Sequence, residues 1–191
     1  MRKFISPVMV IVLLFASAIV SASPSILPDD VLSRLTINYD KFEDSYSVKP
    51  SFDYLETPLN GTQVKLYVFY DANSKSLNMR VSYTGKDWIF FDSCIFLVGD
   101  KRFRTPIYSS INDPVYRDVI SGTDLVIESI YMDAKVAEIM SIINAIETSS
   151  DNVAVEYKLY GSKGTISGKL SSRELQSWHD VLSYYASIEL P

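Results

Sequence analysis

Residues 64–83, VKLYVFYDANSKSLNMRVSY, form the clearest structural pattern in the chain. Two apolar runs, 64–70 and 77–83, flank a mostly polar connection, and this arrangement predicts a β-hairpin. The second run alternates apolar with polar side chains, which is the period of a half-buried strand. The first run carries bulky side chains on both of its faces, so we expect both faces to be covered.

β-rich composition predicts further strands at residues 88–98, 101–105, 125–131, 153–160 and 165–170. Gly99 follows the first of these runs, and glycine accepts the positive φ that a tight hairpin turn requires. Residues 161–164, GSKG, separate the last two runs in a similar way. Both pairs of runs are therefore expected to form antiparallel hairpins.

An amphipathic helix is expected at residues 134–147, with Asp133 as its N-cap. Five apolar side chains fall on one expected face of this helix: Val136, Ile139, Met140, Ile143 and Ile146. A stripe of this kind is typical of a helix face that packs on a core.

A second helix is expected from residue 172 to about residue 188. Ser171 and Glu174 match a capping box. In this motif the side chain of each residue accepts the backbone N–H of the other, so two otherwise unpaired amides at the start of the helix are satisfied. The expected buried stripe consists of Leu175, Trp178, Leu182 and Tyr185.

This order of elements predicts an α+β fold, with a mostly antiparallel sheet of about seven or eight strands and two amphipathic helices packed on it. The alternative is a β-sandwich with two peripheral helices. Residues 59–191 are expected to form a single domain. Residues 23–58, which four prolines interrupt, are expected to form a partly ordered lead-in with a short helix near 29–35 and a short strand near 35–39.

Residues 1–22 have the layout of a secretory signal peptide. Arg2 and Lys3 precede an apolar run without ionisable side chains, and small residues follow it. Cleavage is expected after Ala22, with Ala18 as the second choice. The alternative is an uncleaved membrane anchor, although the run is short for a bilayer span. A membrane association is expected only in that case.

Removal of residues 1–22 lowers the basic count from 18 to 16 against 23 acidic residues, so the mature chain has a net charge of −7. Such an acidic chain has no general electrostatic attraction to nucleic acid or anionic lipid. We therefore expect no nucleic-acid partner.

Cys94 is the only cysteine, and it lies within an apolar run far from the expected cleavage site. Lipid anchoring at the cleavage junction is therefore not expected, and no internal disulfide can form. A buried, unreactive thiol is the expected state of this cysteine. A domain that folds without disulfides suits a bacterial periplasm or the cell exterior.

The sequence contains no nucleotide-binding loop and no exposed-serine elbow, and its single histidine, His179, excludes sites that need two imidazoles. No metal and no cofactor are expected. Paired carboxylates could still act as acid and base in glycoside hydrolysis, and the candidates are Asp87, Asp92 and Glu128. Strand alternation places Asp92 on the same face as Phe90 and Cys94. A carboxylate on that face would need a nearby cation or a position at the margin of the sheet.

These observations favour an exported, non-enzymatic binding protein that contacts another protein or an envelope component. The irregular stretch 106–118 is the expected recognition loop, with Tyr108, Asn112 and Tyr116 as its binding residues. One alternative is a carboxylate-dependent hydrolase of cell-wall glycans. Another is a small carrier of apolar ligands.

Overall fold

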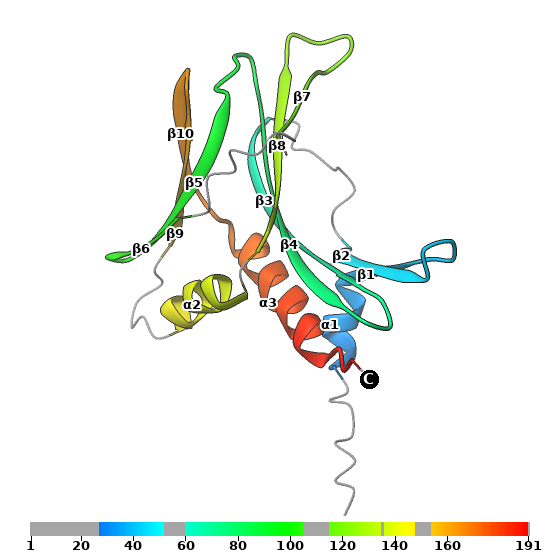
Figure 1. Ribbon diagram of the computed structural model, residues 1–191. Helices are drawn as coiled ribbons and strands as arrows, with labels where there is room; N and C mark the ends of the chain where they lie inside the picture. The colour runs from blue at the N-terminus through cyan, green and yellow to red at the C-terminus, as the bar shows by residue number, and fades with distance from the viewer. Residues whose placement is uncertain (1–26, 52–59, 105–114, 135, 148–153, 191) are drawn as a thin grey trace, which may run out of the picture.

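The computed structural model describes residues 27–51, 60–104, 115–134, 136–147 and 154–190. Within these ranges ten strands form two antiparallel sheets, and three helices accompany them (Figure 1). The α+β prediction is confirmed. The strands exceed the expected seven or eight, and they form two sheets because the chain crosses from one sheet to the other after residue 85.

The six-stranded sheet has the order β1-β2-β3-β4-β8-β7. Its strands are β1 Leu35–Asp40, β2 Ser45–Pro50, β3 Gly61–Tyr70, β4 Lys75–Gly85, β7 Val115–Val119 and β8 Val126–Asp133. The predicted hairpin of residues 64–83 is its centre, formed by β3 and β4. The Asp71 carboxylate accepts the amide N–H groups of Asn73 and Ser74 and so shapes the hairpin turn.

The segment expected as a lead-in contributes helix α1, Asp29–Ser33, and the β1–β2 hairpin. Strand β2 pairs with β3, so this hairpin extends the six-stranded sheet. Arg34, at the end of α1, donates to both carboxylate oxygens of the buried Asp180, at 2.7 and 2.8 Å. This two-point contact ties the start of the described chain to the last helix.

The second sheet has the order β10-β9-β5-β6. Its strands are β5 Phe91–Val98, β6 Lys101–Arg104, β9 Val155–Gly161 and β10 Gly164–Lys169. Both predicted hairpins are confirmed, and Gly99 has the positive φ of 56° expected at the first turn. Strand β5 begins at Phe91, three residues later than predicted, because residues 88–90 form the crossing between the sheets.

Asp92 does not lie on the face of Cys94, so that prediction is wrong. A β-bulge between Phe91 and Ser93 shifts the register and leaves Asp92 exposed, whereas Cys94 is buried. Burial raises the pKa of the Cys94 thiol to about 12. The expected burial of this cysteine is confirmed.

Helix α2, Val136–Glu147, begins two residues later than predicted, and Asp133 is the last residue of β8 rather than an N-cap. Ile139 and Ile143 of the predicted stripe are buried, but Met140 is 38% exposed and the unpredicted Ile142 is buried in its place. Positions 139, 142 and 143 share one side of a helix, and position 140 lies about 100° away from position 139.

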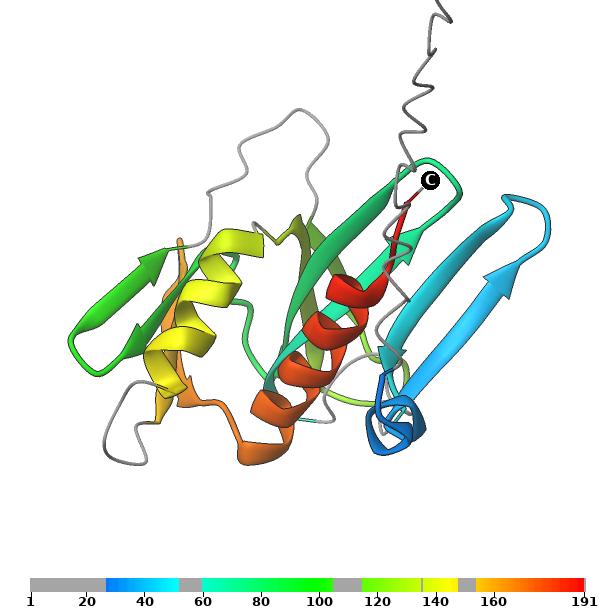
Figure 2. The same cartoon turned by 90° about the horizontal axis from the view of Figure 1, so that it is seen from below.

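Helix α3, Ser172–Ser187, begins with the predicted capping box of Ser171 and Glu174. Trp178 is fully buried at its centre, and Leu182 of the same stripe is buried as well. The Trp178 ring meets Phe96 of β5 edge-on at 5.7 Å, and its Nε1–H donates to the Val64 carbonyl of β3 at 3.4 Å. Seen from below, α2 and α3 lie in front of the strands (Figure 2), and their apolar faces close a core shared by both sheets.

The crossing between the sheets is held by Glu128 of β8, which is fully buried. One carboxylate oxygen accepts the N–H groups of Ile89 and Phe90 at 2.7 and 2.9 Å, and the other accepts the N–H of Phe91 at 3.0 Å. Arg117 Nε lies 3.4 Å from the second oxygen. The Glu128 carboxylate therefore binds three successive residues of the crossing to the six-stranded sheet.

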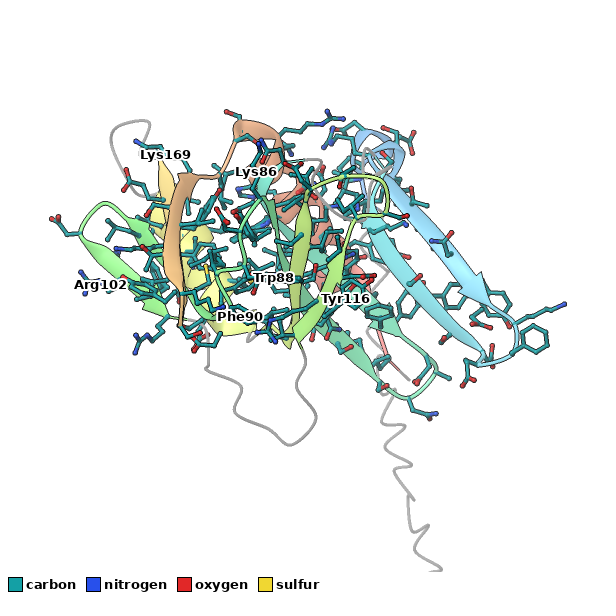
Figure 3. The ribbon with its side chains drawn as sticks, turned by 90° about the horizontal axis from the view of Figure 1, so that it is seen from above. Lys86, Trp88, Phe90, Arg102, Tyr116 and Lys169 are labelled. Carbon is teal, nitrogen blue, oxygen red and sulfur yellow. The ribbon has the colours of Figure 1, made fainter. Side chains whose placement is uncertain are left out.

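Two of these residues, Ile89 and Phe90, are bound to the β9–β10 turn of the second sheet through their carbonyl groups. The N–H of Lys163 donates to the Ile89 carbonyl at 3.1 Å, and that of Ser162 donates to the Phe90 carbonyl at 3.3 Å. Phe90 has a φ of 52°, a conformation that costs a non-glycine residue about 1 kcal/mol or more. Figure 3 places Trp88 and Phe90 between the two sheets.

We predict that Glu128→Gln lowers the free energy of unfolding by about 2–4 kcal/mol. The amide NH₂ turns a hydrogen-bond donor toward backbone donors, and the substitution removes the negative charge that faces Arg117 Nε. Urea unfolding measures the change, with Glu43→Gln on the exposed turn between β1 and β2 as the matched control. Equal stability of the two variants would show that the crossing does not depend on this carboxylate.

Candidate functional site

The face of the six-stranded sheet that points away from α3 is named here the outer face. Along β3 the side chains of Val64, Leu66 and Val68 point into the core and are fully buried. Strand alternation places Lys65 on the opposite side. The strand register sets Lys65 opposite Arg80 of β4, and Arg80 opposite Tyr131 of β8. The outer face therefore carries a row of cation, cation and aromatic ring across three central strands.

A cavity of about 270 Å³ lies on this face and is named the outer-face cavity. Its lining consists of Asn38, Ser47, Lys49, Tyr67, Phe69, Asn78, Arg80 and Tyr131. These residues come from β1, β2, β3, β4 and β8, so five strands shape one hollow. A second hollow, about 590 Å³, adjoins it along the β1–β2 hairpin and shares Asn38, Ser47 and Phe69 with it.

Arg80 is only 5% exposed, although it lines the outer-face cavity. Its guanidinium carbon lies 4.9 Å from the centre of the Tyr131 ring. Its Nη2 reaches Ser129 Oγ at 3.5 Å, a long contact, and Ser129 Oγ itself donates to Ser82 Oγ at 2.9 Å. The Nε of Arg80 is buried without any hydrogen-bond partner.

Lys65 is 4% exposed and lies beside Arg80 in the register. Burial lowers the pKa of Lys65 to about 7, and the positive charges of Arg80 and Lys49 add to this shift. Glu174 acts weakly in the opposite direction. Two basic side chains, Lys49 and Arg80, therefore line the cavity, and Lys65 is buried beside Arg80.

Aromatic side chains supply the apolar part of the cavity lining. Phe69 and Tyr131 are 47% and 48% exposed, and Tyr67 is half-buried. Exposed rings beside buried donors are typical of a surface that holds a ligand with both an apolar and a polar part.

Of the binding residues predicted from the sequence, Tyr108 and Asn112 lie outside the described residues. Tyr116 lies in β7 on the outer face, is half exposed, and donates its hydroxyl to the Asp118 carboxylate at 2.6 Å. It lies opposite Ser129 of the neighbouring strand β8 and does not line the cavity. Figure 3 labels Tyr116 on this strand.

Sequence reasoning missed Arg80, Lys65 and Tyr131 as site residues. The available signal was one cation in each of the two runs of the central hairpin, but alternation alone places Arg80 on the polar face of a half-buried strand. Their burial depends on neighbouring strands, and no local pattern reports it.

The three carboxylates considered for hydrolysis differ in their burial. Glu128 is occupied by three backbone N–H groups and Arg117, so its oxygens are not available as an acid or base. Asp87 and Asp92 are exposed and do not line the outer-face cavity. His179 is half-buried on α3, and the described part of the chain contains no cluster of three metal-ligating side chains.

No protein-family model, curated protein or solved structure matches this chain. Among the described ranges, no helix is both long enough and apolar enough to span a bilayer. The functional proposal therefore depends on the geometry and chemistry of the outer face.

We predict that the free energy of unfolding rises with pH between about pH 7 and 8.5, and that Lys65→Met removes much of this rise. The pKa of Lys65 is about 7 in the folded chain and about 10.4 when unfolded, so in this interval the unfolded chain holds the extra proton. Raising the pH therefore favours folding, with a limit of about 1.4 kcal/mol per pH unit.

Urea unfolding at pH 7.0, 7.75 and 8.5 measures this slope, with Lys41→Met on the exposed β1–β2 turn as the control. The unfolded Cys94 thiol begins to lose its proton within this interval, whereas the folded thiol does not, and this lowers the slope equally in wild type and in both variants. The difference in slope between wild type and Lys65→Met therefore reports Lys65 alone. Parallel slopes for wild type and Lys65→Met would contradict the prediction.

Proposed function

We propose that this chain is an exported, non-enzymatic binding protein that contacts an envelope component or another protein through its outer face. The observation that carries the proposal is the outer-face cavity, which the exposed rings of Phe69 and Tyr131 line together with the buried Arg80. This arrangement offers recognition chemistry in a concave place, which is the usual setting of a binding site.

The outer face is built on the most firmly held part of the fold. Strands β3 and β4 pair over ten residues, and the opposite face of both strands packs into the core. A site on central strands keeps its side chains in defined positions, which reduces the entropy lost on binding. This rigidity favours recognition of a specific partner.

Charge narrows the class of partner. The mature chain expected after signal cleavage has a net charge of −7, whereas Lys49 and Arg80 line one cavity and Lys65 lies opposite Arg80 in the strand register. The overall charge repels long polyanions such as nucleic acids, but the local cations attract a single acidic group. The same cations disfavour the alternative of a carrier for purely apolar ligands.

We predict that the product isolated from the native host begins at Ser23 and lies outside the cytoplasm. Val20, Ser21 and Ala22 have the small or modest side chains that a signal peptidase accepts, which suits cleavage after Ala22. Mass spectrometry of fractionated cells measures both the N-terminus and the compartment, and an Ala22→Gln variant should be processed poorly. A product that retains Met1 and remains in the cytosol would overturn the export proposal.

We predict that the double variant Phe69→Ala and Tyr131→Ala binds its envelope or protein partner at least about 10-fold more weakly than wild type. Exposed aromatic anchors commonly contribute 1–2 kcal/mol or more to an interface. Co-sedimentation with the insoluble cell-wall fraction of the host measures the first kind of partner. Crosslinking in intact cells followed by mass spectrometry measures the second.

The matched control for this experiment is Met140→Ala, an exposed apolar residue on α2 rather than on the outer face. Unfolding midpoints should remain close to wild type in both variants, because all three side chains are substantially exposed. If the double variant and the control retain partners equally well, the outer face is not the binding surface.

A further inference from the structure

Arg80 is in a state that the fold alone does not explain. Buried arginines in proteins are normally paired or fully hydrogen-bonded. Here Arg80 is 5% exposed, its Nε has no partner, and its one side-chain hydrogen bond is the 3.5 Å contact with Ser129. Among the residues that the structure describes, no carboxylate forms an ion pair with Arg80.

Two lysines add positive charge near Arg80. Lys65 lies directly opposite it on β3, and Lys49 of β2 lines the same cavity. The mutual repulsion of these cations contributes to the lowered pKa of Lys65. An anion in the cavity would reduce this repulsion and compensate the guanidinium charge of Arg80.

The rest of the lining indicates what carries the anion. The cavity of about 270 Å³ is close to the lower end of small-molecule pockets, so it admits a group of about one ring. Tyr67 and Tyr131 offer ring faces, while the amides of Asn38 and Asn78 offer donors and acceptors. A polar ring bearing an acidic group matches this set.

We infer that the outer-face cavity binds the carboxylate or phosphate group of a ring-sized ligand, such as an acidic sugar unit, with the Arg80 guanidinium as its anchor. This inference rests on the proposed function and names the chemistry of the group that the binding face recognises. The oxyanion faces the Arg80 guanidinium from the cavity, and the ring of the ligand packs on the aromatic lining.

Three sugars that differ at one carbon test the inference: glucose, glucuronate and glucose 6-phosphate. Titration into the ¹⁵N-labelled protein follows the Arg80 Nε–H signal and gives an affinity from its shift. We expect glucuronate, glucose 6-phosphate or both to move this signal with dissociation constants at least 10-fold lower than that of glucose. Inorganic phosphate is added separately, and its effect shows how much of the binding needs no ring.

Variants separate the charge of Arg80 from its hydrogen-bonding geometry. Arg80→Lys keeps the charge but lacks Nε, and Arg80→Met removes both, so acidic sugars should bind at least about 10-fold more weakly to each. Arg102→Met on the second sheet is the matched control and should bind as wild type does. Because removal of a buried charge can alter folding, the unfolding midpoint of each variant is measured, and Arg80→Lys decides the result if Arg80→Met does not fold.

The inference is overturned if no acidic probe moves the Arg80 Nε–H signal at concentrations up to about 50 mM, which suffice to detect binding in the millimolar range. Equal affinity for all three sugars also overturns it, since the cavity would then recognise the ring alone. Neither result affects the proposed function if the Phe69 and Tyr131 double variant still loses its partner. Failure of both experiments removes the outer face as a binding surface.

Discussion

The rest of the structure depends on one buried carboxylate. Glu128 of β8 binds three successive backbone N–H groups at the point where the chain leaves one sheet for the other. A buried charge must be compensated, and these amides together with Arg117 provide that compensation. The contact holds Phe90 in its left-handed conformation and precedes the bulge at Asp92, so it determines where β5 starts and which of its side chains reach the core.

Helix α3 completes what this crossing begins. Its Trp178 contacts Phe96 of the second sheet and the Val64 carbonyl of the first, so one side chain joins the two halves of the core. Asp180 on the same helix binds Arg34, and the Lys75 ammonium at the β3–β4 turn donates to the carbonyls of Tyr185 and Ile188. The inner faces of both sheets are thereby covered, and the central strands keep only their outer face for contacts with other molecules.

The outer face departs from the rules that the core obeys. Lys65 and Arg80 are buried cations side by side, and the long Ser129 contact leaves Arg80 Nε without an acceptor. Such local conflicts weaken a fold, and in natural proteins they concentrate where binding or catalysis requires them. The exposed rings of Phe69 and Tyr131 lie at the same cavity. This coincidence of electrostatic strain and apolar exposure is the physical basis for assigning recognition to this face.

The sequence by itself determined the α+β class, the hairpins of β3–β4, β5–β6 and β9–β10, the capping box of α3 and the burial of Cys94. These features follow from alternation, turn residues and capping, which involve residues close together in the chain. Only the tertiary structure decided that Glu128 binds residues 37 to 39 positions away, that Asp92 is exposed by a bulge, and that Arg80 is buried at a cavity. Those outcomes depend on contacts between distant segments, and no local pattern of residue types encodes them.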